Sequence, residues 1–165
     1  KGSSKMKFCD FVIADSVVAQ LKGTDKEAVI TELVSQVHAT GHVEESQVED
    51  IIGAVLKREE LGSTGIGKGV AVPHTKHPSV KGLVGTVGLS QDGVDFTSVD
   101  GEPVHIFFLL ISPPDSTAEH LQALGHISKN LKDDQFCQFL RGSTTREQIQ
   151  ELLDEADNQK FGVQD

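Results

Sequence analysis

The sequence has few cysteines and no long apolar run, the features that cross-link disulfide-rich proteins and anchor membrane proteins. Its two cysteines, Cys9 and Cys137, are too few for a disulfide scaffold and lack metal-ligand spacing. This usage fits a reducing compartment, and we expect a cytoplasmic protein. The longest unbroken apolar run, residues 106–111, is far shorter than the ~20 residues that a membrane-spanning helix needs. We therefore expect no direct membrane insertion.

Basic residues are also outnumbered. Fifteen Lys and Arg against 25 Asp and Glu give a formal net charge of -10, which repels phosphate backbones and anionic lipids. Nucleic acid is therefore excluded as an expected partner. A length of 165 residues without a long linker predicts one domain. We interpret residues 1–5 as an expression leader, residues 6–157 as the domain and residues 158–165 as a C-terminal tail.

Apolar periodicity predicts helices at both ends of the chain. A capping-box pair, Thr24 and Glu27, opens a first helix that ends at Gly41. Apolar residues at i, i+3, i+4 and i+7 predict a second helix over residues 45–60, with Gly62 as its C-cap. Three later helices are also predicted. The first begins at the capping-box pair Ser116 and Glu119 and runs to about Lys132. The other two lie near residues 134–140 and over residues 144–156.

The middle of the chain is rich in strand signals. Short apolar segments predict strands at residues 17–21, 70–72 and 83–89, and the run over residues 104–111 predicts a strand buried on both faces. Asp92-Gly93 and Asp100-Gly101 are typical of turns between the last two. Helices alternating with buried strands predict an α/β sandwich whose sheet is covered on both sides.

A glycine-rich stretch precedes the second short strand. Residues 62–69 nearly match the phosphate-binding loop GxxxxGK[ST], but Gly69 stands where a hydroxyl should bind magnesium. The stretch also lies between a helix and a strand, the reverse of that loop's order. Two other interpretations stay open: glycines that only form tight turns, and a loop whose backbone N–H groups bind an anion.

Two of the seven histidines stand where ligand-facing side chains emerge from an α/β sheet. His74 ends a short strand directly after the glycine-rich stretch, and His120 lies in the first turn of the helix after the buried strand. With Arg58 they could form a phosphoryl pocket, although an exposed turn histidine and a core histidine are the simpler interpretations. His77 forms an i, i+3 pair with His74, but no third metal ligand is near. His126 lies about 120° around the helix from His120 and cannot share its site.

A family resemblance is carried by residues 58–74, which read REELGSTGIGKGVAVPH, and continues through residues 100–104 and 119–121. These residues resemble the signature around the phosphorylated histidine of type-2 enzyme IIA domains. This is the fructose, mannitol and nitrogen-related class of the bacterial phosphoenolpyruvate-dependent phosphotransferase system. The resemblance implies a three-layer α/β sandwich, with a small mixed sheet flanked by helices on both faces. Thr75 departs from the family pattern, in which Gly or Ala commonly follows the histidine.

The resemblance also implies roles for individual residues. His74 would accept a phosphoryl group from the phosphohistidine of the small carrier HPr, assisted by Arg58 and His120. The expected phosphate-binding groups are those of the loop residues Ser63, Thr64 and Gly65. We expect no metal and no cofactor, because transfer between histidines rests on positioning and hydrogen-bond donors.

Two functions follow from the family. In the first, the protein passes the phosphoryl group to a downstream transporter domain, an enzyme IIB domain, during sugar uptake. In the alternative, it is a nitrogen-related regulator whose phosphorylation state controls binding to a regulatory protein target, without sugar transport.

Overall fold

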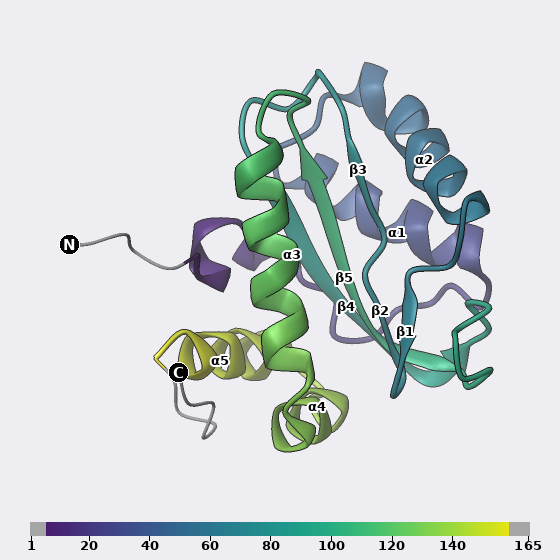
Figure 1. The fold of residues 1–165 in the computed structure, drawn as a ribbon, viewed down its shortest axis with the longest axis vertical. Helices are drawn as coiled ribbons and strands as arrows, with labels where there is room; N and C mark the ends of the chain where they lie inside the picture. Colours follow the sequence, from purple (N-terminus) through teal and green to yellow (C-terminus); the bar gives the residue numbers. More distant parts are fainter. Residues whose placement is uncertain (1–5, 159–165) are drawn as a thin grey trace.

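A mixed five-stranded sheet forms the middle layer of the protein, shown by a computed structural model that describes residues 6–158 (Figure 1). The interpreted leader and residues 159–165 lie outside the described residues. The strands are β1 (Gly65–Gly67), β2 (Val70–Ala71), β3 (His74–Lys76), β4 (Val84–Val94) and β5 (Val104–Ser112). Strand β5 is central: β4 pairs with it antiparallel, whereas β2 and β3 pair with it in parallel.

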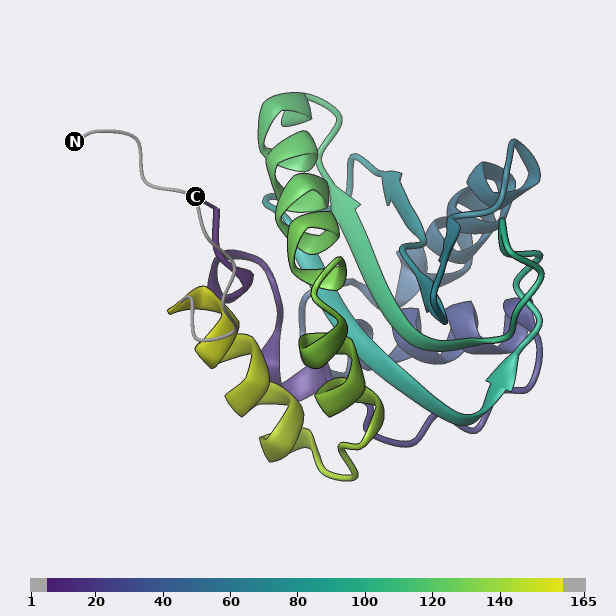
Figure 2. The ribbon, with the colours of Figure 1, turned by 60° about the horizontal axis from the view of Figure 1, so that its bottom comes forward.

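Five helices and two short 3-10 turns cover this sheet. The helices are α1 (Lys26–Ala39), α2 (Glu45–Glu60), α3 (Thr117–Leu131), α4 (Asp134–Arg141) and α5 (Arg146–Asp157); the turns are η1 (Phe8–Asp10) and η2 (Ala14–Ser16). Helices α1 and α2 lie on one side of β4 and β5, and α3, α4 and α5 lie on the other (Figure 2). No helix within residues 6–158 combines the length and the apolarity needed to cross a membrane.

Alternation along β5 creates two hydrophobic cores. Ile106, Phe108 and Leu110 pack in the cluster that includes α3, α4 and α5, whereas Phe107 and Leu109 pack in the cluster with α1 and α2. All five side chains are buried, and each such burial stabilises the fold by roughly 1.5–3 kcal/mol. The continuous apolar run therefore indicated a strand covered on both faces, and the predicted three-layer sandwich is confirmed.

Helix starts differ from the sequence expectation. Asp25, not Thr24, is the N-cap of α1, and its carboxylate accepts a hydrogen bond from the backbone N–H of Ala28. Ser116 occupies the N-cap of α3, but its side chain makes no capping hydrogen bond. The helices themselves form as predicted because their apolar stripes, not their caps, determine where they pack.

Strand boundaries show three further corrections. Residues 17–21 contribute only an isolated parallel bridge, between Val18 and Gly88. Asp92-Gly93 does not separate two strands but lies within β4, where Gly93 has φ +86° and the register to β5 shifts. Part of the predicted loop forms β1, which pairs antiparallel with β2 across a turn at Lys68 and Gly69, whose φ angles are 60° and 78°. Two successive positive φ angles are typical of a tight hairpin turn.

Candidate functional site

His74 does not end the preceding short strand, as predicted, but begins β3, beside Leu110 of β5. Its Nδ1 lies 2.8 Å from the backbone oxygen of Val72. A carbonyl can only accept, so Nδ1 carries the ring proton and donates it, which leaves the lone pair on Nε2. The Val72 hydrogen bond holds the ring in one orientation, and the side chain is half-buried, so it keeps some contact with solvent.

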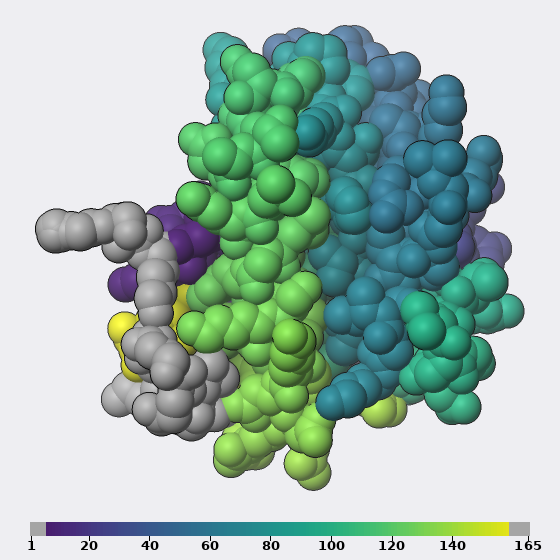
Figure 3. All heavy atoms as spheres, viewed as in Figure 1, coloured from purple at the N-terminus to yellow at the C-terminus, as the bar shows by residue number. Residues whose placement is uncertain are grey.

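His120 lies against this imidazole. Helix α3 begins five residues after β5 ends, and its first turn folds back over the same end of the sheet. The ring centroids of His74 and His120 are 5.4 Å apart, with an interplanar angle of 57°. His120 is buried, and its Nδ1 lies 2.6 Å from Oγ of Ser112, the last residue of β5. The surface formed by α3 adjoins that formed by the segment containing β2 and β3 (Figure 3).

Both imidazoles are neutral at pH 7. Burial lowers the pKa of His74, and the charge of Arg58 lowers it further, against the opposing effects of the Val72 hydrogen bond and Glu59. Burial, with contributions from His74 and Lys76, lowers the pKa of His120 to about 4. A neutral imidazole keeps a lone pair on one nitrogen, so His74 can act as a nucleophile near neutral pH.

Arg58 stands in the last turn of α2, and its charge acts on His74. Its Nη1 donates a hydrogen bond of 2.8 Å to the backbone oxygen of Gly62. This bond ties the guanidinium to the start of the glycine-rich stretch and leaves its other N–H groups as donors. The structure therefore brings His74, His120 and Arg58 into one region, although they lie far apart in sequence.

The loop residues Ser63, Thr64 and Gly65 are placed differently from the expectation. Oγ of Ser63 donates to the backbone oxygen of Phe96 at 2.5 Å and accepts from the N–H of Gly65 at 2.9 Å. Thr64 is buried and directs both its N–H and its hydroxyl to the carboxylate of Glu59. These donors fix the loop, so they do not face an external phosphoryl group.

Glu59 is a residue that the sequence interpretation did not single out. Its carboxylate is buried at the end of α2 and also lies 3.3 Å from Nζ of Lys26. It therefore joins α1, α2 and the loop at Thr64, one residue from Arg58. Lys76 was missed in the same way: its Nζ contacts Oγ1 of Thr117 at 3.0 Å, and its charge acts on His120. Neither residue belongs to a spacing pattern, because each contact crosses between elements.

His77 is occupied elsewhere. Its Nε2 lies 2.5 Å from Asp50 and its Nδ1 lies 2.7 Å from Oγ of Ser79. Within residues 6–158, no group of three or more His, Cys, Asp or Glu side chains is arranged to hold a metal ion.

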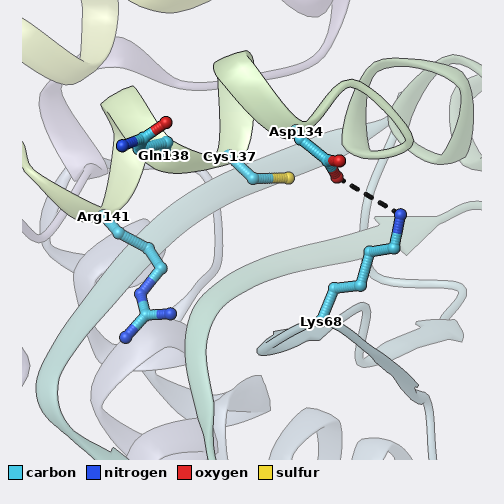
Figure 4. Close-up of a pocket in the computed structure, with 5 residues that line it drawn as sticks. All are labelled: Lys68, Asp134, Cys137, Gln138 and Arg141. Carbon is cyan, nitrogen blue, oxygen red and sulfur yellow. Dashed lines mark hydrogen bonds and ion pairs between the residues drawn. The ribbon is translucent and has the colours of Figure 1, made fainter.

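A separate cavity of about 380 Å³ lies between the turn of the β1–β2 hairpin and α4 (Figure 4). Lys68 reaches from the hairpin turn toward α4, where its Nζ lies 3.3 Å from Asp134. Because β2 pairs near the start of β5 and His74 near its end, this lysine is remote from the histidine pair. The hairpin geometry thus does not form a phosphate-binding loop of the GxxxxGK[ST] type.

The fold and the site define an α/β sandwich that presents a neutral, oriented imidazole beside a second imidazole and a guanidinium. The family comparison agrees with this description. The chain belongs to the family "Phosphoenolpyruvate-dependent sugar phosphotransferase system, EIIA 2", whose model matches residues 10–156.

Individual relatives include both functional branches of that family. A nitrogen regulatory protein of Bradyrhizobium diazoefficiens is 34% identical over 149 residues, which cover 90% of this chain and 95% of the relative. The fructose-specific EIIABC component of Bacillus subtilis is 31% identical over 152 residues, covering 92% of this chain but 24% of that longer protein. The crystal structure of the nitrogen regulatory protein IIA-Ntr of Neisseria meningitidis superposes with a TM-score of 0.79 at 27% identity, covering 87% and 97% of the two chains.

Proposed function

We propose that this protein is a phosphocarrier in which His74 accepts a phosphoryl group from an HPr-like phosphohistidine carrier. The observation that carries the proposal is the 2.8 Å contact between Nδ1 of His74 and the Val72 carbonyl. This hydrogen bond fixes the tautomer and directs the Nε2 lone pair outward as the nucleophile.

The transfer step exchanges one N–P bond for another. The Nε2 lone pair of His74 forms a bond to phosphorus, while the N–P bond of the donor phosphohistidine breaks and its electron pair returns to the donor ring. The donor, protonated on its other nitrogen, leaves as neutral imidazole. The Nδ1 proton of His74 stays on its ring, where the Val72 oxygen stabilises the positive charge that the ring gains.

Arg58 and His120 supply the electrostatic part of the reaction. The migrating group spreads negative charge over its three equatorial oxygens, and preorganised donors near those oxygens stabilise the transition state. The Arg58 guanidinium offers a fork of N–H donors and a positive charge, whereas His120 contributes as a neutral donor. Glu59 and Thr64 hold the end of α2 and thereby the position of Arg58.

In this function phospho-His74 would donate its phosphoryl group to an enzyme IIB domain of a sugar transporter. The protein would therefore act in the cytoplasm. The similarity to a fructose-specific EIIABC component supports this destination. Chemically, the same surface must accept two successive partners, because one imidazole first receives and then donates the phosphoryl group.

A regulatory function is the second candidate. The 34% identity to a nitrogen regulatory protein extends over 95% of that relative, so the resemblance is not confined to the site. In this function phosphorylation of His74 would change which protein target binds, and no sugar would be served.

The first experiment is phosphorylation with purified components. The protein is incubated with phosphoenolpyruvate, enzyme I and HPr, and its intact mass is then measured. We expect one added phosphoryl group on the wild type and none on His74→Ala. His42→Ala, which removes an exposed histidine outside the site, is the matched control and should gain the full mass. An unmodified wild type, or a fully modified His74→Ala, would refute the proposal.

A second experiment separates the carrier from the regulator. The phosphorylated protein is mixed with a purified fructose-type enzyme IIB domain, and the mass of each component is followed. Movement of the phosphoryl group to IIB supports the carrier. Retention on His74, together with a regulatory target that binds only one of the two phosphorylation states, supports the regulator.

A further inference from the structure

Ser112 ends β5 directly behind the histidine pair, and nothing in the sequence pattern marks it. Its side chain is completely buried. Oγ lies 2.6 Å from Nδ1 of His120, and the structure gives this oxygen no other hydrogen-bond partner among residues 6–158. The backbone oxygen of Ser112 accepts a 2.8 Å hydrogen bond from the N–H of His77, so the end of the strand is held in place.

The burial of this hydroxyl decides the direction of the hydrogen bond. If Nδ1 of His120 carried the ring proton and donated it, the hydroxyl hydrogen of Ser112 would be buried without an acceptor. Such a group loses its hydration and gains nothing in return. If the hydroxyl donates to Nδ1 instead, the buried hydroxyl hydrogen has an acceptor, and Nε2 of His120 is not among the fully buried side-chain atoms of residues 6–158 that lack a partner. Nδ1 is then the acceptor, and the ring proton of His120 resides on Nε2.

We propose that Ser112 is a positioning residue for phosphoryl transfer: its hydroxyl fixes His120 as the Nε2–H tautomer. This inference rests on the proposed function and deepens it. The Ser112 hydroxyl contacts no substrate atom; it acts through the ring that it orients.

The consequence is a pair of imidazoles with complementary tautomers. The Val72 carbonyl gives His74 a lone pair on Nε2, and the Ser112 hydroxyl gives His120 a hydrogen on Nε2. With the centroids 5.4 Å apart, one ring offers the nucleophile and the other a hydrogen-bond donor for the phosphoryl oxygens. The donor needs no positive charge, which agrees with the burial of His120 and with the Lys76 charge near it.

The direct test is the position of the His120 ring proton. In protein labelled with ¹⁵N on histidine, two-bond ¹H–¹⁵N spectra at pH 7.5 distinguish the tautomers. We expect Nε2 of His120 to be protonated and Nδ1 to accept in the wild type, with a mixture of both tautomers in Ser112→Ala. A proton on Nδ1 in the wild type would overturn the inference. This measurement uses the folded wild type, so it remains decisive even if Ser112→Ala does not fold.

The kinetic test compares matched variants. Ser112→Ala should slow transfer from phospho-HPr to His74 about 10-fold in kcat with unchanged KM, as expected when a group that orients a functional histidine is lost. Ser112→Thr, which keeps the hydroxyl, should restore most of the rate and the Nε2–H tautomer. Ser90→Ala removes a buried serine of β4 outside the site and should transfer at the wild-type rate. A wild-type kcat in folded Ser112→Ala would contradict the inference.

The two proposals fail in different ways. A wild type that cannot be phosphorylated defeats the proposed function, whatever the tautomer of His120. A wild type that is phosphorylated on His74 but carries the His120 proton on Nδ1 leaves the phosphocarrier intact and removes only the role of Ser112.

Discussion

Two pairs of side chains show how differently this protein uses histidine. His74 and His120 face each other at one end of β5, and within residues 6–158 neither forms a hydrogen bond to a carboxylate. His126, farther along α3, has its Nε2 3.2 Å from the carboxylate of Asp157, and its ring makes a T-shaped contact with Phe8, with centroids 4.4 Å apart. A backbone oxygen or hydroxyl sets a tautomer without adding charge, whereas the Asp157 carboxylate places a negative charge beside His126.

Asp157 joins the two ends of the fold, and its contacts with His126, Phe8 and Cys9 are called the clasp here. Its carboxylate also accepts hydrogen bonds from the N–H groups of Phe8, at 2.7 Å, and Cys9, at 3.0 Å. Burial raises the pKa of Asp157, but the hydrogen bonds from His126, Phe8 and Cys9 outweigh it and the pKa is lowered. In the proposed function the histidine pair carries the chemistry, whereas the contacts of Asp157 stabilise the fold.

The largest expected effect is a difference in the rate of phosphoryl transfer between variants of the two histidines of α3, His120 and His126. His120→Ala should slow phosphoryl transfer to His74 by about 10²–10³-fold, because one preorganised donor is lost from the transition state. His126→Ala should change that rate less than about 2-fold, because its ring contacts Asp157, Phe8 and Asn130 and not the histidine pair. Rapid-quench measurement with phospho-HPr checks both variants. Equal losses would mean that the two histidines do not differ as described.

The next largest effect lies in the clasp. Asp157→Ala leaves two backbone N–H groups and His126 without their acceptor, and should lower the free energy of unfolding by about 3 kcal/mol. Urea denaturation at pH 7 measures the change. Asp154→Ala, at an exposed position of the same helix, is the control and should lose less than about 1 kcal/mol. Phosphorylation of folded Asp157→Ala should proceed at the wild-type rate; a comparable loss in both variants would argue against the clasp.

The contributions of His120 and Asp157 to the free energy of unfolding should also be lost in separate ranges of pH. The pKa of His120 falls from an ordinary 6.5 to about 4 on folding, so the unfolded chain binds protons first as the pH decreases. The contribution of His120 to the free energy of unfolding is therefore fully present above pH 6.5 and is lost as the pH falls toward 4. The pKa of Asp157 is lowered from 3.8, so its contribution is lost only below that value.

Urea titrations between pH 8 and 3 test this separation. His120→Gln should flatten the profile between pH 6.5 and 4, and Asp157→Asn should flatten it only below about 4. A His120→Gln profile that follows the wild type throughout the upper range would contradict the lowered pKa of His120.

The smallest effect is expected at Lys68, whose ion pair with Asp134 is exposed to solvent. Lys68→Ala should cost less than about 1 kcal/mol and leave phosphoryl transfer unchanged. Lys68→Gly should be at least as stable as Lys68→Ala, because glycine adopts the observed φ of 60° without steric cost. Thermal melts of the wild type with ATP should show no shift. An ATP-dependent shift that Lys68→Ala abolishes would restore the nucleotide-binding interpretation.

The sequence was informative wherever a periodic signal repeats over several residues. Helix α2 has the predicted bounds because its apolar stripe ends there, although Leu61, and not the predicted Gly62, is its C-cap. Strand β5 extends only one residue beyond the prediction, since burial on both faces requires a continuous apolar run. The segregation of His120 from His126 also followed from helix geometry and is confirmed, as the two histidines contact different partners.

Features that depend on contacts between distant segments could not be predicted in this way. The pairing of β1 with β2 rests on positive φ angles at Lys68 and Gly69, which a run of glycines permits but does not impose. Ser112 acquires its surroundings only when β5 and α3 meet, and Glu59 only when α1, α2 and the loop at Thr64 meet. The proximity of His74 to His120 could be anticipated from the strand end, but the groups that orient the two rings could not.

The clasp at Asp157 has an architectural consequence. Residues separated by 149 positions in sequence are joined by a 2.7 Å hydrogen bond, so the polypeptide enters and leaves the folded body at nearly one point. A domain with this property can be inserted into a larger polypeptide while the two segments that flank it stay close together. It should also tolerate circular permutation, with a short peptide joining the old ends and new ones opened in the exposed turn at Asp100-Gly101.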